Sequence, residues 1–210
     1  MQTLSSPKPT FAPCEIEIDR SHGAHARHRW TLGRRASFWV AFGVSAHTLW
    51  TSAAPALSYR LYIDQWRLSP IETTGAFAIY PLFVVTTLVL FGDLSDHIGR
   101  RLTMLVALLS SLVGALMLAG AGGLGWLLAA RAIMGIGVGL GSGSSTAAIL
   151  EFSANRDPER AAAVTNVAQA IGFATALVLG GALIQYLPWP LSLNFLALAA
   201  VIVALATAVW

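Results

Sequence analysis

The chain has 210 residues, of which 56% are hydrophobic and only 11% are charged. Ordinary soluble domains carry about 25% charged residues, so this composition, with a mean hydropathy of +0.66, excludes a water-soluble globular protein. A single cysteine, Cys14, excludes a disulfide framework and a multi-thiolate metal site, because both need several sulfur atoms.

Residues 1–35 form a polar segment that ends in a basic run. The segment lacks the apolar stretch of a secretory signal, so we expect a disordered tail that stays in the cytoplasm. His22, His25 and His28 have a spacing that metal ligands also use, but a tail without a supporting shell favours simple polarity. No metal site is expected here.

Six apolar stretches follow, each near the roughly 20 residues that an α-helix needs to cross a bilayer. None alternates polar and apolar residues as a barrel strand would, so the predicted fold is an all-α membrane bundle of six transmembrane helices. The predicted spans cover residues 36–58, 73–91, 102–121, 124–150, 161–186 and 191–210.

The basic residues predict how this bundle is oriented. Of 13 Lys and Arg residues, ten lie in the tail or in the connections after the second and fourth predicted spans. Only Arg60 and Arg67 lie in the alternate loops. Because Lys and Arg resist translocation, we expect both chain ends in the cytoplasm, in the plasma (inner) membrane of a bacterium. The net charge of +3 is then explained by topology, and no nucleic-acid partner is expected.

The most polar connection is the run GDLSDHIGRR at residues 92–101, between the second and third predicted spans. Its glycines allow a tight turn, and its two arginines hold the turn in the cytoplasm. Seven positions match, in register, the signature G-x-L-[AS]-D-[RK]-x-G-R-[RK]: Gly92, Leu94, Ser95, Asp96, Gly99, Arg100 and Arg101. The run therefore resembles the signature loop of the major facilitator superfamily. His97 departs from it, since a permanent cation is usual there.

A second motif lies in the fourth predicted span, where residues 131–139 resemble the family's R-x-x-x-G-x-G-x-G segment. Gly135, Gly139 and Gly143 recur every four residues and predict close packing against another helix. Arg131 lies inside the span, where a cation costs at least ~2.5 kcal/mol at mid-bilayer. Two interpretations stay open: a snorkelling arginine, or a cavity cation that binds an anion or biases a proton site.

One weaker family feature lies in the fifth predicted span, and another flanks the connection that precedes this span. The pattern G-x-x-x-G-P-x-x-G-G is half present, with Gly172, Ala176, Leu177, Gly180 and Gly181 in register, which weakens a drug-antiporter interpretation. Glu151 and Arg160 resemble the acid and the arginine that flank the preceding connection. Because topology places Asp96, Arg100 and Glu151 at one membrane face, we expect Arg100 between the two carboxylates, as a gate that opens during transport.

Polar side chains within the spans predict which helices line a solute path. The candidates share helix faces: His47, Trp50 and Thr51 in the first span, Tyr80 in the second, Arg131 and Ser142 in the fourth, and Asn166 and Gln169 in the fifth. The resemblance implies the same four helices, with the third and sixth facing lipid. A helix-to-helix hydrogen bond is the competing interpretation for each residue. His47, too deep to snorkel, is the expected proton carrier and Arg131 its expected neighbour.

Two enzymatic interpretations are disfavoured. The glycines between residues 135 and 143 never satisfy G-x-G-x-x-G and follow no strand, so no dinucleotide cofactor is expected. The sequence around Ser142 lacks the leading glycine of an intramembrane serine protease. We therefore expect no enzymatic activity and no cofactor.

The resemblance covers residues 36–210 and implies one six-helix half of a twelve-helix transporter, built from two inverted three-helix repeats. The expected function is secondary active transport of a small solute by alternating access, coupled to protons. The expected partners are lipid, the solute, and a second half or a homodimer partner that covers the polar faces of the first, fourth and fifth spans. The alternative is a membrane scaffold or vestigial half that transports nothing.

Overall fold

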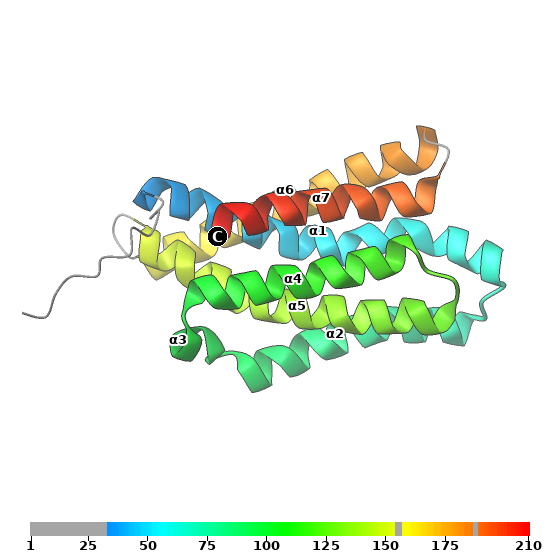
Figure 1. The fold of residues 1–210 in the computed structure, drawn as a ribbon, viewed down its shortest axis with the longest axis horizontal. Helices are drawn as coiled ribbons and strands as arrows, with labels where there is room; N and C mark the ends of the chain where they lie inside the picture. Colours follow the sequence, from blue (N-terminus) through cyan, green and yellow to red (C-terminus); the bar gives the residue numbers. More distant parts are fainter. Residues whose placement is uncertain (1–32, 154–156, 187–188) are drawn as a thin grey trace, which may run out of the picture. The chain divides into compact units, whose positions relative to one another are not determined.

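The computed structural model describes residues 33–153, 157–186 and 189–210, and every regular element in these ranges is an α-helix. The helices are α1 (Arg34–Trp66), α2 (Pro70–Phe91), α3 (Leu94–Ile98), α4 (Arg100–Ala119), α5 (Leu124–Phe152), α6 (Pro158–Tyr186) and α7 (Pro190–Val209). The long helices lie side by side, and each runs antiparallel to the long helix before it in the chain (Figure 1). One end of the bundle holds α3 and is called the α3 end here. The connections from α1 to α2 and from α4 to α5 lie at the opposite end.

Five of the described helices are long and apolar enough to cross a membrane: α2, α4, α5, α6 and α7. The sequence predicted six spans, and the sixth long helix, α1, is long enough but not apolar enough to count as one. It is the longest helix, at 33 residues, but several of its polar side chains are buried, among them Ser45, His47, Thr48 and Thr51. These side chains lower the hydropathy of α1 while the neighbouring helices shield them from lipid.

The observed helix bounds agree with the predicted spans within three residues, except at the carboxyl end of α1. Arg34 and Arg35, assigned to the tail by sequence, begin the helix. At its other end α1 continues to Trp66, so most of the expected loop after residue 58 is helical. No proline or glycine interrupts residues 59–66, and the helix ends only at Arg67, in the left-handed conformation with φ 49°. The remaining tail residues, 1–32, lie outside the described ranges.

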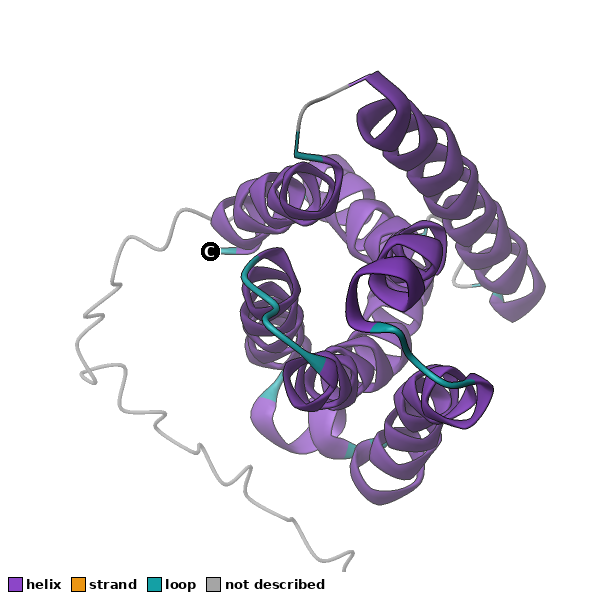
Figure 2. Ribbon diagram, turned by 90° about the vertical axis from the view of Figure 1, so that its right-hand side faces the viewer, coloured by secondary structure: helices purple, strands orange, loops and turns teal. Residues whose placement is uncertain are grey.

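Two helices form the centre of the bundle. α5 packs against α4, α2 and α1, and α1 packs against α6, α5 and α7. Figure 2, which looks nearly along the helices, shows α2 and α6 at the margins. Both expose large apolar side chains, such as Val85 and Val89 on α2 and Ile171 and Val178 on α6. Lipid or another protein surface must cover these side chains in a membrane.

Glycines set how closely the central helices meet their neighbours. A Cβ atom at Gly135 would lie 2.7 Å from the Tyr80 carbonyl oxygen, and one at Gly139 would lie 2.7 Å from the Thr87 Cβ. The predicted glycine stripe therefore brings α2 against α5, as expected for small residues in a membrane helix. The same contact places the Tyr80 side chain of α2 next to Arg131 of α5.

Candidate functional site

Arg100 joins three helices at the α3 end. Its Nη1 atom lies 2.9 Å from Glu151 Oε2 of α5, and its Nη2 atom lies 3.9 Å from Asp96 Oδ1 of α3. Nη1 also donates a hydrogen bond to the carbonyl oxygen of Ala147, in α5. The predicted position of Arg100 between the two carboxylates is confirmed.

The strength of this cluster is modest. The Arg100 side chain is 32% exposed and that of Glu151 47%, so water screens the pair, and such ion pairs contribute about 1 kcal/mol or less. The hydrogen bond to Ala147 adds a second attachment near the carboxyl end of α5, where free carbonyl groups favour a cation. A contact of this strength can hold the loop against α5 and can break at a small cost in free energy.

The loop geometry explains the glycines in the signature. Gly99 has φ 90°, a left-handed backbone conformation that strains residues with a side chain. A Cβ atom at Gly92 would lie 2.6 Å from the Leu88 carbonyl oxygen. The half-buried Leu94 and the exposed His97 lie between these glycines, and His97 Nδ1 is 3.0 Å from the carbonyl oxygen of Asp93. The turn therefore directs Arg100 to α5 and leaves His97 on the surface.

Two further arginines bind helix carboxyl ends at the same face. Arg101 Nε donates to the Val209 carbonyl oxygen of α7 at 2.7 Å. Arg34 donates to the carbonyl oxygens of Phe152 (3.2 Å) and Ser153 (2.5 Å), which end α5. Sequence reasoning missed Arg34, because a basic run before the first span is also the ordinary signal for cytoplasmic retention.

Arg160, the other expected gate partner, does not join the cluster. Its Nε atom lies 3.5 Å from Asp157 Oδ2, three residues earlier in the chain, and the side chain is 72% exposed. Asp157 also accepts a hydrogen bond from the backbone nitrogen of Glu159 at 3.0 Å. The structure therefore places Arg160 in a local pair at the start of α6.

The candidate path residues in the middle of the bundle have local partners. His47 Nε2 lies 2.8 Å from Thr51 Oγ1, both buried on α1, and Trp50 beside them is half-buried. Ser142 donates to the Val138 carbonyl oxygen of its own helix at 2.8 Å. On α6, Asn166 is exposed and Gln169 half-buried. The hydrogen bonds described for His47 and Ser142 thus stay within their own helices.

Arg131 is buried among aromatic rings, with 3% of its surface exposed. Its guanidinium lies over the Tyr80 ring, 4.3 Å from the ring centroid. The Tyr59 hydroxyl lies close enough to interact electrostatically with the guanidinium, but without hydrogen-bond geometry. The Tyr59 ring stacks on Phe77 at a centroid distance of 4.0 Å. Arg131 is thus enclosed by the bundle, which is not the position of a snorkelling side chain.

Arg131 and His47 are not neighbours, contrary to the sequence-based expectation. Within the described residues His47 bonds to Thr51, whereas Arg131 lies against Tyr80 and Tyr59. Tyr59, the α1 residue beside Arg131, is 12 residues from His47, which is about 18 Å along the helix.

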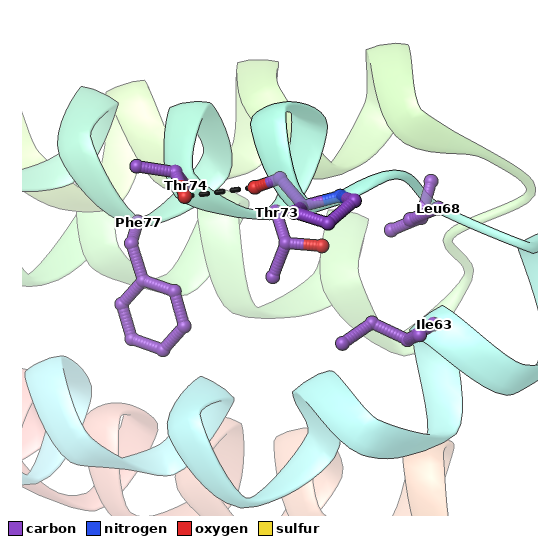
Figure 3. A pocket seen from close by; sticks show the side chains of 6 residues that line it. Ile63, Leu68, Thr73, Thr74 and Phe77 are labelled. Atoms are coloured by element: carbon purple, nitrogen blue, oxygen red, sulfur yellow. Dashed lines mark hydrogen bonds between the residues drawn. The ribbon is translucent and has the colours of Figure 1, made fainter.

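An open groove of about 550 Å³ lies between the end of α1 and the start of α2. Ile63, Leu68, Pro70, Thr73, Thr74 and Phe77 line it (Figure 3). α2 begins here with a capping box, in which Ser69 N donates to Glu72 Oε2 at 2.8 Å and Glu72 N to Ser69 Oγ at 3.3 Å. No residue predicted from the sequence lines this groove, because residues 59–72 were expected to form a loop.

Comparison with known proteins gives one result on the family. The family model described as Major Facilitator Superfamily matches residues 39–210, which include the loop with Arg100, the segment with Arg131 and the His47 region. No curated relative matches the chain.

Proposed function

The chain belongs to the major facilitator superfamily, a family of membrane transporters, and from this premise we propose that it moves a small solute by alternating access as a secondary active transporter. The observation that carries the proposal is the contact of Arg100 with Asp96, Glu151 and the Ala147 carbonyl. In an alternating-access cycle the α3 end has to close and reopen. A partly exposed ion pair between the loop and α5 suits this task, since its cost of opening is small.

We propose further that the chain acts as an N-terminal half that meets a second six-helix half or a second copy of itself. On this proposal α1 is the sixth spanning helix, and its buried polar groups are tolerated because α5, α6 and α7 surround it. The exposed apolar residues of α2 and α6, together with the exposed Asn166, support a partner along these two helices. A coding sequence that continues in frame with six more spans would identify a covalent second half.

Proton coupling through His47 is the third part of the proposal. His47 is the one histidine within the described long helices, and the carboxylates of these helices lie within three residues of a helix end: Asp64, Glu72, Glu151 and Glu159. Its Nε2 atom faces Thr51 Oγ1 at 2.8 Å, so the imidazole has a polar partner in either tautomer. A protonated imidazole in this place needs water or an anion, which the opening of one side of the bundle would admit.

The test is transport in proteoliposomes with an imposed pH gradient, on the chain and on any longer protein that contains it. We expect the gradient to drive accumulation or efflux of a solute from a broad panel. His47→Gln should abolish the gradient-driven flux and leave solute exchange intact. Ser144→Ala, which alters a buried hydroxyl bonded within α5, is the matched control and should change neither. No flux from any form of the protein would favour the non-transporting scaffold, and gradient-driven flux that survives His47→Gln would remove His47 from the coupling.

A further inference from the structure

Arg131 has no opposite charge in the described part of the chain. The Asp and Glu side chains described there are exposed or partly exposed, and the ion pairs they form involve only Arg100 and Arg160. Burying an unpaired cation is costly, so such a group ordinarily has a carboxylate beside it. The rings of Tyr80 and Tyr59 offset only part of that cost, since a cation–π contact contributes about 2 kcal/mol when desolvated.

Two guanidinium nitrogens of Arg131 are buried without a hydrogen-bond acceptor among the described residues. Nε and Nη1 of Arg131 and the Tyr59 hydroxyl are all buried and lack a hydrogen-bond partner among the described residues. Two of these atoms can only donate, and the Tyr59 hydroxyl can donate as well. A bound anion would accept from all three, and charge-assisted bonds of this kind are stronger than neutral ones.

These donors lie next to the groove between α1 and α2. Phe77 belongs to both, because it lines the groove and stacks on Tyr59, which faces Arg131. The stack of Phe77 on Tyr59 and the closeness of Tyr59 to Arg131 place these three side chains at one level of the bundle. In Figure 3 the Phe77 ring points from α2 toward α1 at the inner end of the groove. One aromatic layer therefore separates the groove from the guanidinium.

The groove has the size and lining of a site for a small apolar group. Its volume of about 550 Å³ lies within the usual range of ligand pockets. Four of its six lining residues, Ile63, Leu68, Pro70 and Phe77, are apolar. Thr74 Oγ1 is already bonded to the Pro70 carbonyl oxygen at 2.8 Å, so it adds little free polarity (Figure 3).

We propose that Arg131, Tyr59 and Tyr80, together with this groove, bind a monocarboxylate that has a compact apolar body. The carboxylate accepts hydrogen bonds from Arg131 and the Tyr59 hydroxyl, and the apolar body occupies the groove once the Phe77 ring turns aside. The proposal rests on the proposed transport function and names the class of solute. Net charge decides the specificity: the anion compensates Arg131, whereas a neutral analogue leaves the guanidinium unpaired and a cation repels it.

The experiment measures binding, separately from transport, on the full chain in nanodiscs. Radiolabelled benzoate, phenylacetate and isovalerate serve as anionic probes, with the matching amides as neutral competitors. We expect saturable binding of at least one acid, and at least about tenfold weaker competition by its amide, because hydrogen bonds to a charged group contribute more than neutral ones. Arg131→Gln should weaken binding about tenfold or more, and Arg131→Lys should weaken it less.

Arg60→Gln is the matched control. Arg60 is an exposed arginine near the same end of α1 and does not line the groove, so its loss should leave binding unchanged. Helix content by circular dichroism checks the fold of each variant. If Arg131→Gln does not fold, two other measurements still test the proposal. These are the comparison of acid with amide on the unaltered chain and the binding of the acid to Arg131→Lys.

Three results would overturn the proposal: no saturable binding of any acid to the folded chain, equal binding of acid and amide, or unchanged binding in folded Arg131→Gln. These results are distinct from failure of the transport function. Binding that depends on Arg131 without any flux would refute transport and leave the site standing. Gradient-driven flux of a neutral or cationic solute that is unaffected by Arg131→Gln would support transport and refute the carboxylate site.

Discussion

Arg100 contacts two carboxylates, and the structure ranks them. Glu151 is at 2.9 Å and belongs to α5, whereas Asp96 is at 3.9 Å, 66% exposed, and only four residues away in the chain. Removing the Glu151 charge removes the ion pair between the loop and α5 and leaves the Arg100 bond to the Ala147 carbonyl, while removing the Asp96 charge changes a weak local pair. The two substitutions should therefore differ in effect.

We expect Glu151→Gln to lower stability by about 1 kcal/mol or less, and Asp96→Asn to lower it by a smaller amount. Both effects should shrink at high salt, because exposed charges are screened. Thermal unfolding in detergent at low and high ionic strength measures this. Asp64→Asn, which removes an exposed carboxylate with no ion pair among the described residues, is the control and should have no effect. An Asp96→Asn effect that equals or exceeds that of Glu151→Gln would contradict the ranking.

At the level of whole helices, the crossing of α1 and α6 depends on one glycine. A Cβ atom at Gly172 would lie 1.9 Å from the carbonyl oxygen of Ala46, a backbone atom that cannot move without displacing α1. Gly181, on the same helix, has open space around its Cβ position. The half-present motif of the fifth predicted span thus contains glycines with very different packing constraints.

Gly172→Ala should destabilise the bundle by about 1–3 kcal/mol, the usual range for overpacking, or prevent its assembly. Gly181→Ala should be neutral or slightly stabilising, because alanine is the better helix former by about 1 kcal/mol. Yield of monodisperse protein and thermal unfolding of the two variants give the comparison. If both alanines are tolerated equally, α1 and α6 do not approach as closely as described.

For the molecule as a whole, the distribution of Lys and Arg predicts which membrane side each end of the bundle faces. The α3 end carries Arg34, Arg35, Arg100, Arg101 and Arg160, and the opposite end only Arg60 and Arg67. We expect the α3 end in the cytoplasm. In a Cys14→Ser background, a membrane-impermeant maleimide should label Gln65→Cys from outside intact cells, and Glu159→Cys only after permeabilisation. Labelling in the opposite pattern would invert the orientation.

One expectation about the whole molecule is wrong in its premise. The sequence suggested that a six-helix half on its own would expose the polar faces of three spans to lipid. In the structure His47 and Thr51 of α1 and Arg131 and Ser145 of α5 are buried within the same bundle. Only α6 leaves a candidate polar residue, Asn166, exposed. A partner would therefore mainly cover the exposed apolar side chains of α2 and α6. It would bury fewer polar side chains than the sequence suggested.

The sequence by itself determined the helical membrane architecture, because hydropathy and length are local properties that a bilayer reads directly. It also determined the loop that holds Arg100 and its pairing with Glu151. Chain connectivity and the spacing of the loop place both charged groups at the α3 end, where they form an ion pair. The glycine stripe of Gly135 and Gly139 was readable for the same reason, since periodicity on one helix predicts a close contact.

Only the tertiary structure decided what surrounds each polar side chain. Tyr59, Phe77 and Arg131 are far apart in the sequence and meet because α1 extends two turns further than its hydropathy suggests, while α2 approaches α5 over glycine. Whether Arg131 snorkels or stays buried depends on those neighbours, which no local pattern encodes. The separation of His47 from Arg131 also depends on this packing, because Arg131 lies beside Tyr59, about 18 Å along α1 from His47.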